Sequence, residues 1–118
     1  MIKTLVTGKY GEWLAARYLK KGGYSILKRN YKNPIGEIDI IAMDAETIVF
    51  VEVKTRTSDE FGEPVEAIDY KKRKKIINTA RLYLRKHGST PAARFDLVGI
   101  SLGKSGREII HLKDIFEL

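Results

Sequence analysis

The run GEIDIIAMDAETIVFVEVK, residues 36 to 54, constrains the fold of this chain more than any other stretch. Two apolar, β-branched segments flank a short polar link at residues 44 to 47. This pattern predicts antiparallel strands from about residue 37 to 43 and from about residue 48 to 54. An acidic residue interrupts each strand, Asp39 in the first and Glu52 in the second. Because a carboxylate on a part-buried face costs free energy unless its charge is compensated, both residues require an explanation.

Apolar periodicity and turn signals predict two helices and three more strands around this hairpin. We expect a first helix capped by Thr7 and ending near Lys21, followed by a strand at 24 to 31 and a turn at 33 to 36. After the hairpin we expect a loop at 58 to 64 and a second helix at 69 to 87. Two strands at 93 to 102 and 108 to 112 then flank a turn at 103 to 106, and a helical turn follows within 113 to 118. The order α-β-β-β-α-β-β predicts an α/β fold of the mixed α+β kind, with helices packed on a mixed sheet. A chain of 118 residues can bury one core but not two, so we expect a single domain over residues 1 to 118.

Composition excludes several classes of site. The chain has no cysteine, which rules out disulfides and thiolate-ligated zinc or iron–sulfur centres. Its first residues lack the apolar segment of a signal peptide, and no stretch approaches the roughly 20 apolar residues of a membrane span. We therefore expect a cytoplasmic protein with no membrane partner.

Positive and negative charges are segregated along the chain. Residues 36 to 69 carry ten acids and two bases, whereas residues 71 to 87 carry eight bases and no acid. The second predicted helix begins with a basic run: Lys71, Lys72, Arg73, Lys74 and Lys75. The helix dipole disfavours cations there, and a phosphate backbone would reverse that penalty. We predict that this run, together with Arg56, binds nucleic acid through its backbone, DNA more than RNA; a solvated helix face is the alternative.

Helical periodicity divides the basic run into two faces. Residues 72, 73, 76, 77 and 80 are expected to lean toward the sheet. The residues expected to lean outward are Lys71, Lys74, Lys75, Asn78, Arg81 and Arg85. If this helix flanks the acidic hairpin, Lys72 or Arg73 would approach a bound phosphate.

The register of the hairpin places its two acids across from each other. Side chains alternate faces along a strand, and a link at residues 44 to 47 pairs Ile41 with Phe50 and Asp39 with Glu52. Two carboxylates with Cβ atoms about 4.5 to 5.5 Å apart repel each other, and a divalent cation is the simplest compensation. Oxygen ligands without Cys or a nearby His suit Mg²⁺ or Mn²⁺. Lys54, on the same face as Glu52, would reach an anion held there.

A salt-bridged strand end is the alternative explanation of these acids. In that case Lys54 or Arg56 would neutralise Glu52, and Asp39 would pair with a base such as Arg94. We expect Asp96 to brace Arg94 or a neighbouring strand, and we assign neither His87 nor His111 to the site. A third acid favours the functional explanation, because the first predicted helix places Glu12 on an otherwise apolar stripe.

The spacing of these residues resembles a known signature. Asp39, twelve residues and then Glu52-Val53-Lys54 look like the D…ExK motif of the PD-(D/E)XK nuclease superfamily, although Ile38 stands where proline is usual. The stretches GEWLAARYLKKGGYSILKRNY, GEIDIIA, FVEVKTR, FGEP and RFDLV are similar, in this order, to the bacterial YraN-like family, whose members are mostly described as uncharacterised. The chain also resembles archaeal Holliday-junction resolvases. The resemblance implies a restriction-endonuclease-like αβββαβ core, with Glu12, Asp39 and Glu52 as metal ligands and Lys54 as the catalytic lysine.

These observations favour a metal-dependent endonuclease that hydrolyses phosphodiester bonds in DNA, including branched or otherwise structured DNA. In such chemistry a metal polarises the scissile phosphate and activates water, while a lysine stabilises the developing charge. The alternatives are a non-catalytic nucleic-acid-binding module with the same fold and an RNA-processing nuclease. A homodimer is expected if the enzyme cuts two strands of a junction.

Overall fold

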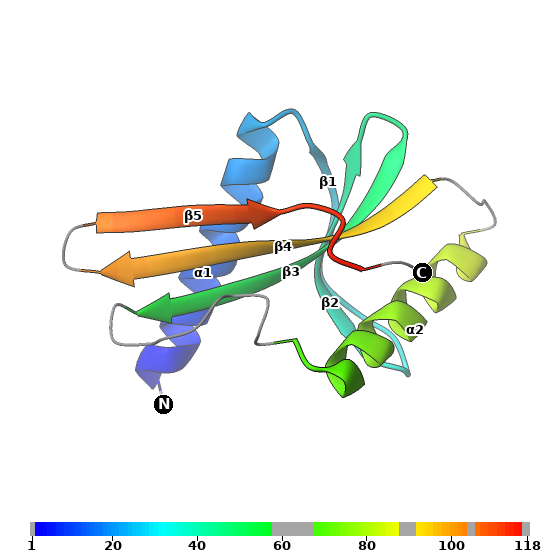
Figure 1. Cartoon of the computed structure of the whole chain (residues 1–118), viewed down its shortest axis with the longest axis horizontal. Helices are drawn as coiled ribbons and strands as arrows, with labels where there is room; N and C mark the ends of the chain where they lie inside the picture. The colour runs from blue at the N-terminus through cyan, green and yellow to red at the C-terminus, as the bar shows by residue number, and fades with distance from the viewer. Residues whose placement is uncertain (1, 58–67, 88–91, 104–105, 117–118) are drawn as a thin grey trace.

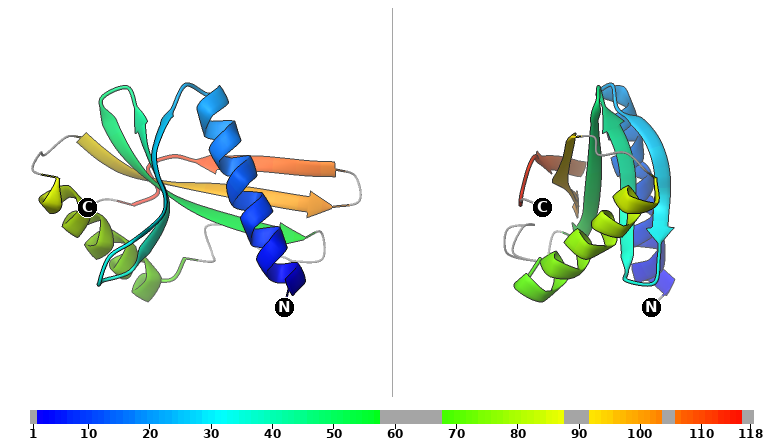
Figure 2. Two further views of the ribbon diagram at one scale, coloured as in Figure 1. Left: turned by 180° about the vertical axis from the view of Figure 1, so that it is seen from behind. Right: turned by 90° about the vertical axis from the view of Figure 1, so that its right-hand side faces the viewer.

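A computed structural model describes residues 2–57, 68–87, 92–103 and 106–116, which form a five-stranded sheet with one helix on each face (Figures 1 and 2). The elements are α1 (Ile2–Lys21), β1 (Ser25–Lys32), β2 (Glu37–Asp44), β3 (Thr47–Thr57), α2 (Tyr70–Lys86), β4 (Ala92–Gly103) and β5 (Gly106–Leu112). Their order and the mixed α+β class confirm the prediction and are compatible with a restriction-endonuclease-like core.

The strands lie in the order β1-β2-β3-β4-β5. The first three form an antiparallel meander, β3 and β4 pair in parallel, and β5 returns antiparallel to β4. A parallel pair needs a crossover connection, and the segment that contains α2 supplies it (Figure 1). Among the described strands, β1 and β5 are therefore the edges and β3 is central.

Alternation along the strands gives the sheet two apolar faces. On one face, Val49 and Val51 pack in a cluster with Leu19 of α1. On the other, Phe50 packs in a cluster with Tyr83 of α2. All five side chains are buried, so a charge on either face needs compensation.

The β2–β3 hairpin has the predicted register, with Ile41 opposite Phe50. Its link is shorter than expected, because Asp44 pairs with Thr47 and leaves a turn of two residues. Ala45 in this turn has a φ of 54°, and such left-handed residues are what two-residue hairpin turns require. The tighter turn leaves the predicted pairing unchanged as far as Ile40 and Val51, and the ladder ends there, one residue short of Asp39 and Glu52.

The predicted start of α1 was wrong. The helix begins at Ile2, so Thr7 lies inside it and does not cap it. The apolar spacing of Ile2, Leu5 and Val6 continues the helical period upstream. Packing of α1 on the sheet outweighs the low helix propensity of the glycines that follow Thr7.

The predicted C-terminal helical turn was also wrong for the part that the structure describes. Residues 113–116 are not helical. The backbone N–H of Ile115 donates to the carbonyl oxygen of Phe95 at 2.8 Å, so this segment is tied to β4 and does not form bonds of its own. The predicted loop at residues 58 to 64 and residues 104–105 of the predicted turn lie outside the described residues.

Gly11 sets how closely α1 approaches the sheet. It is buried, and a Cβ at this position would overlap the side chain of Thr55 in β3. A residue without a side chain is therefore needed where the helix crosses the strand. This close approach brings the next residue, Glu12, to the carboxylates of the β2–β3 hairpin.

Candidate functional site

A hollow of about 880 Å³ opens where β2 and β3 separate. The two strands pair from Asp44 and Thr47 as far as Ile40 and Val51, and the ladder stops there. Side chains from both faces of the sheet can therefore reach the gap beyond it. The charged residues that line the hollow are Glu12, Lys32, Glu37, Asp39, Glu52, Lys54, Asp69, Lys71, Lys72 and Lys75.

Asp39 occupies the position where the strand ladder ends. Its Oδ2 accepts a hydrogen bond from the backbone N–H of Val53 at 2.8 Å. This bond replaces the backbone pairing that β2 and β3 no longer make, and it fixes the carboxylate beside β3. Asp39 is thereby held next to Glu52, as the hairpin register predicted.

Glu52 is the most perturbed acid of the hollow. Only 14% of its side chain is exposed. Burial, the negative charge of Asp39 and a hydrogen bond with Asp39 raise the pKa of Glu52 to about 9, while the nearby charge of Lys72 acts to lower it. Without another cation, the Asp39–Glu52 pair holds a proton at neutral pH, because two adjacent carboxylates resist simultaneous ionisation.

Glu12 approaches the pair from α1. Burial and the charge of Asp39 raise its pKa, whereas a hydrogen bond with Asn30 and the charge of Arg29 lower it. Asn30 adopts a left-handed φ of 54°, a conformation that asparagine tolerates better than most residues. The pKa of Glu12 is therefore raised overall, and Asn30 and Arg29 of β1 limit the rise.

The donor set was tested for its fit to a divalent cation. Within residues 2–57, 68–87, 92–103 and 106–116, no group of three acidic or histidine side chains is close enough together to hold a metal ion. Two adjacent carboxylates, one of them with a raised pKa, still provide the oxygen ligands and the excess negative charge that suit Mg²⁺ or Mn²⁺. Asp39 and Glu52 therefore fit such an ion, whereas Glu12, the third ligand that the resemblance implied, does not complete a group of three with them.

The two basic residues of β3 that the sequence assigned to the site, Lys54 and Arg56, lie in different environments. Lys54 is exposed and lines the hollow on the same strand as Glu52. Arg56 does not line the hollow, and its Nε donates to Ser101 Oγ of β4 at 3.4 Å. The structure therefore brings Lys54, but not Arg56, to the carboxylate pair.

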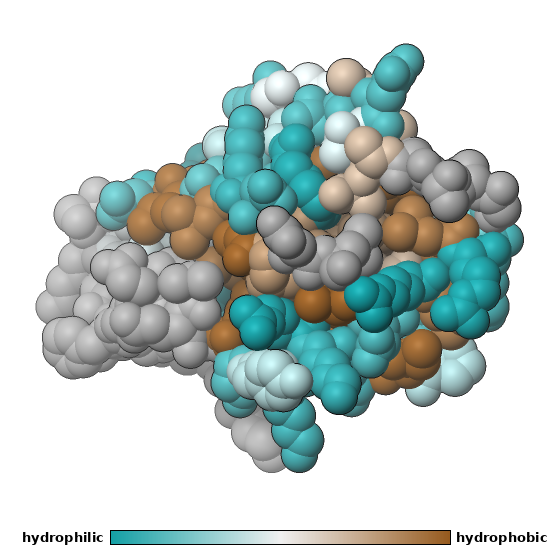
Figure 3. All heavy atoms as spheres, turned by 45° about the vertical axis from the view of Figure 1, so that its right-hand side comes forward, coloured by the Kyte–Doolittle hydropathy of each residue, from teal (hydrophilic) through white to brown (hydrophobic). Residues whose placement is uncertain are grey.

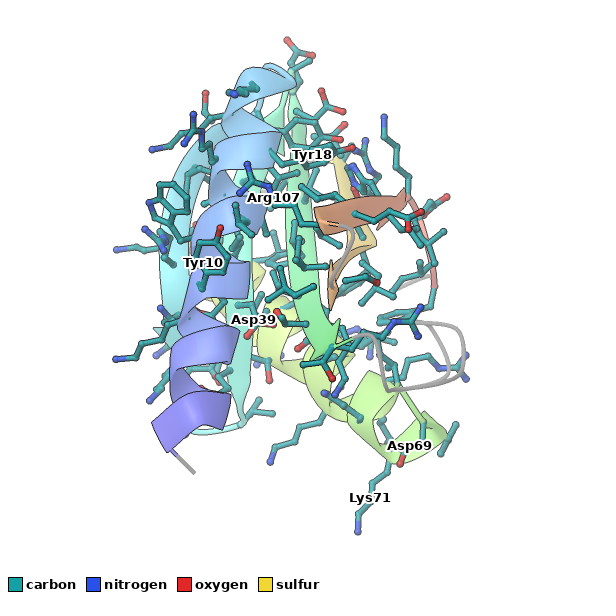
Figure 4. All side chains as sticks on the ribbon, turned by 90° about the vertical axis from the view of Figure 1, so that its left-hand side faces the viewer. Tyr10, Tyr18, Asp39, Asp69, Lys71 and Arg107 are labelled. Atoms are coloured by element: carbon teal, nitrogen blue, oxygen red, sulfur yellow. The ribbon has the colours of Figure 1, made fainter. Side chains whose placement is uncertain are left out.

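Helix α2 directs a row of lysines into the same hollow. Asp69 caps the helix, its Oδ1 accepting from the backbone N–H of Lys72 at 2.8 Å. The Lys72 ammonium lies 4.0 Å from Glu52 Oε1. Lys71 and Lys75 also line the hollow. In Figure 4, Lys71 extends from the end of α2 into solvent, so it forms part of the rim.

The predicted orientation of α2 was partly wrong. We expected Arg73 to lean toward the sheet and Lys71 and Lys75 to lean outward. Arg73 is instead exposed, with its guanidinium over the Tyr70 ring at 5.6 Å. Lys71 and Lys75 are exposed as expected, although both also line the hollow. Thr79, which the apolar period did not include, is buried on the packed face beside Ile76, Ala80 and Tyr83. Its hydroxyl donates to a backbone carbonyl of the preceding turn, so a polar residue occupies the packed face.

The outer surface of α2 remains strongly hydrophilic. Figure 3, viewed toward this side of the molecule, shows hydrophilic side chains over the helix with hydrophobic residues visible beside them. Lys74 is exposed and does not line the hollow. The basic run predicted from sequence is thus split between the hollow and the outer surface.

The salt-bridge alternative fails in its details. The structure pairs Glu52 with Lys72, whereas that alternative assigned Lys54 or Arg56. Arg94 Nε donates to Asp96 at 3.0 Å, and its NH1 donates to Asp44 at 3.1 Å, so Arg94 is not the partner of Asp39. The prediction that Asp96 braces Arg94 is confirmed.

Two residues of the hollow were missed from the sequence. Asn30, which balances Glu12, was taken as an ordinary strand residue, and Lys32 was overlooked beside it. An asparagine inside a strand is the signal that could have marked the first, since asparagine is depleted in strands and tolerates left-handed backbone. Lys32 carries no comparable signal, because lysines are common at strand ends.

None of the described helices is both long enough and apolar enough to cross a membrane.

Comparisons with known proteins identify relatives over the whole chain. A UPF0102 protein of Syntrophus aciditrophicus is 49% identical over 119 aligned positions, which cover 100% of this chain and 94% of the relative. A UPF0102 protein of Persephonella marina is 46% identical and covers 96% of this chain and 95% of the relative. The family described as "Uncharacterised protein family UPF0102" matches residues 11–100, which include the acidic hairpin and α2. The chain therefore belongs to the UPF0102 (YraN) family, as its sequence motifs predicted.

Proposed function

We propose that the protein is a metal-dependent nuclease that hydrolyses phosphodiester bonds in DNA, with Asp39 and Glu52 holding Mg²⁺ or Mn²⁺. The Asp39–Glu52 pair carries this proposal. It is held at the end of a strand ladder, and the pKa of Glu52 is raised to about 9 although the Lys72 ammonium lies 4.0 Å from its Oε1. Strong perturbation of a carboxylate in an open hollow is typical of functional sites.

The residues of the hollow divide the chemistry between them. When bound, a divalent cation supplies Lewis acidity that polarises a phosphate and acidifies water. Asp39 and Glu52 would hold that ion, and the bond from Val53 keeps Asp39 in place. Lys54 would stabilise the negative charge that develops on the phosphate. Glu12 would orient water from the α1 side, since it lines the same hollow and its pKa is raised by the charge of Asp39.

The α2 side of the hollow supports a phosphate-bearing substrate. Lys71, Lys72 and Lys75 converge there on the N-terminal end of the helix. Helix N-termini and cations both attract phosphate. With a formal charge of +7 for the chain, these groups favour a polyanionic backbone over a small neutral substrate.

The test is a cleavage assay with labelled linear, single-stranded, flapped and four-way-junction DNA and with RNA, each with Mg²⁺ or Mn²⁺. Wild type is expected to cut at least one DNA, whereas Asp39→Ala and Lys54→Ala are expected to lose about 100-fold or more of the rate, as removal of one group that stabilises charge commonly costs. Glu46→Gln, an exposed acid at the hairpin turn, and Lys86→Ala, an exposed base in the last turn of α2 outside the hollow, are the matched controls.

The outcomes separate the alternatives. Cleavage that survives both site substitutions would come from a contaminant and overturn the assigned site. Binding to DNA without cleavage of any substrate would favour the non-catalytic module. Cleavage restricted to RNA would keep the chemistry and replace the substrate.

A further inference from the structure

The solvent-facing side of α1 carries an aromatic and cationic ladder that the hollow does not use. The ladder consists of Tyr10, Trp13 and Arg17, spaced so that neighbours on the helix surface touch. The Tyr10 and Trp13 rings are stacked with centroids 6.1 Å apart and planes inclined by 15°. The Arg17 guanidinium lies over the Trp13 ring at 5.4 Å. Trp13 is 45% exposed and Tyr10 is 40% exposed, so these large rings are available to a partner.

We propose that this Trp13 ladder binds the unpaired bases of a nucleic-acid strand that enters or leaves the hollow. The inference rests on the proposed function and names its substrate class: single-stranded DNA, or branched DNA with an unpaired arm. Stacking on aromatic side chains accepts any base, because every base has a π-face. The ladder would therefore select for strand structure and not for sequence.

Helix geometry makes the ladder continuous with the hollow. At about 100° per residue, Trp13 lies one step around α1 from Glu12, and Lys9 falls between them at about 60°. Glu12 lines the hollow, and Lys9 is exposed. A helix is about 10 to 12 Å across with its side chains, so a strand leaving the hollow needs to pass only part of one helix to reach Trp13.

The charge of this region favours a polyanion. Residues 1 to 36 contain eight Lys and Arg residues and one acid, Glu12, which faces the hollow. Arg17 and Lys20 are exposed on α1, and Arg29 is exposed on the neighbouring β1. Aromatic rings interleaved with cations are the composition of single-strand binding surfaces.

The ladder extends at its other end to the β4–β5 hairpin. Arg107 NH1 donates to the Tyr10 hydroxyl oxygen at 3.0 Å, and Figure 4 shows Arg107 and Tyr10 on the same side of α1. Beside them lies a second hollow of about 590 Å³, lined by Tyr10, Leu102, Gly103, Gly106 and Arg107. An apolar wall with one arginine at its mouth suits a base together with its phosphate, which gives the strand a further contact.

The single tryptophan of the chain reports on the proposal directly. The metal-free protein is titrated with oligo(dT), with a blunt duplex of the same length and with inorganic polyphosphate, while Trp13 fluorescence and affinity are followed. Stacked bases are expected to quench Trp13. Polyphosphate supplies charge without bases, so it is expected to bind without comparable quenching, and the blunt duplex is expected to quench less than oligo(dT).

Two substitutions at one position separate stacking from charge. Trp13→Ala is expected to weaken oligo(dT) binding by about 5-fold to 150-fold, the equivalent of one lost base stack, with polyphosphate affinity unchanged. Trp13→Phe keeps an aromatic face and is expected to retain most of the affinity. Unchanged oligo(dT) affinity in Trp13→Ala, or equal quenching by polyphosphate and oligo(dT), would overturn the proposal. Quenching by anionic lipid vesicles but not by oligonucleotides would overturn it in favour of a membrane surface.

Failure of this inference is distinguishable from failure of the nuclease proposal. Asp39→Ala, which is expected to lose cleavage, is expected to keep the quenching of Trp13 by oligo(dT). Quenching without cleavage in wild type would refute the nuclease and leave the ladder standing. Cleavage without quenching would refute the ladder and leave the nuclease standing.

Discussion

The protein buries two acids in opposite ways. Asp96 is fully buried and accepts hydrogen bonds from His111 at 2.7 Å, from Arg94 at 3.0 Å and from the backbone N–H of Asp114 at 3.1 Å. Burial alone would raise the pKa of Asp96, but these donors outweigh it and hold the pKa below its usual range. Glu52 is less buried and has another carboxylate as its neighbour, so its pKa rises to about 9.

This difference shows that burial by itself does not mark a functional acid. The fold neutralises Asp96 with its own cations, and that carboxylate has no capacity left for a ligand. The same fold places the Asp39–Glu52 pair beside an open hollow, where burial and the charge of Asp39 outweigh the charge of Lys72 in setting the pKa of Glu52. A carboxylate pair whose charge the protein does not compensate can be compensated by a bound cation.

The largest expected effect is on stability and comes from replacing Asp96, the acid whose charge the protein compensates. Asp96→Ala removes the acceptor of four hydrogen bonds, two of them from part-buried Arg94, which keeps its contact with Asp44. We expect a loss of about 3 to 5 kcal/mol in the free energy of unfolding, measured by urea denaturation at pH 7. Glu46→Ala, an exposed acid, is the control and is expected to change stability by less than about 0.5 kcal/mol. If Asp96→Ala does not fold, His111→Phe tests the same network. A loss below about 1 kcal/mol for either variant would contradict the structural role.

The two acids should also differ in the sign of their pH dependence. The folded pKa of Glu52 lies above its usual 4.5, so its contribution is fully present below pH 4.5 and is lost as the pH rises toward 9. The slope is at most about 1.4 kcal/mol per pH unit, which gives at most about 2 to 3 kcal/mol between pH 7 and pH 9. Asp96, whose pKa is lowered, loses its contribution only as the pH falls below its usual value.

Glu52→Gln checks this directly, because glutamine cannot ionise. Urea denaturation of the metal-free variant between pH 5 and pH 9 is expected to give a flatter stability curve than wild type. Equal slopes for wild type and Glu52→Gln would show that Glu52 titrates normally, and the contrast with Asp96 would disappear.

A divalent metal ion should stabilise the protein through the Asp39–Glu52 pair and not through Asp96. At pH 8, Mg²⁺ or Mn²⁺ at ten times its dissociation constant is expected to raise the free energy of unfolding of wild type by about 1.4 kcal/mol. Asp39→Asn is expected to lose this gain, whereas Glu46→Gln is expected to keep it. Thermal unfolding with and without the metal measures both. A gain that persists in Asp39→Asn would place the ion elsewhere.

The smallest effect is expected at Lys72. Its side chain is 45% exposed, so its ion pair with Glu52 contributes less than about 1 kcal/mol to stability. Lys72→Met removes a charge that lowers the pKa of Glu52, and the loss of stability at alkaline pH should shift to higher pH. Metal affinity, followed by calorimetry, should rise because the competing ammonium is gone. Lys75→Met is the matched control, since Lys75 lines the same hollow. Equal shifts in the two variants would show that only the general charge of the hollow matters.

Sequence reasoning predicted those features that depend on local pattern. The alternation of apolar residues, together with the position of the link at 44 to 47, predicted the hairpin register. The predicted meeting of Asp39 and Glu52 is made by their side chains beyond the end of that ladder. The helix period found α2 but missed the burial of Thr79, whose hydroxyl donates to a carbonyl within the helix so that the residue packs like an apolar one. No local pattern reports such an internal hydrogen bond.

Long-range partners were the other limit. Asn30 meets Glu12 only because α1 and β1 pack side by side, and His111 meets Asp96 only because β5 returns beside β4. The exposure of Trp13 is a further feature that no local pattern predicts, since a large aromatic residue next to an apolar stripe is compatible with packing inward. Its exposure follows from the rotation of α1, which Gly11 and the small residues of the helix determine against β3.

Gly11 gives this arrangement an unexpected sensitivity. The contact between Gly11 and Thr55 sets the distance between helix and strand. Glu12 and Trp13 follow Gly11 directly in the chain. A single methyl group at position 11 would lift α1 and carry both residues away from Asp39 together. Under the two proposals, Gly11 therefore sets the distance between the phosphodiester bond that is cut beside Asp39 and the base that stacks on Trp13.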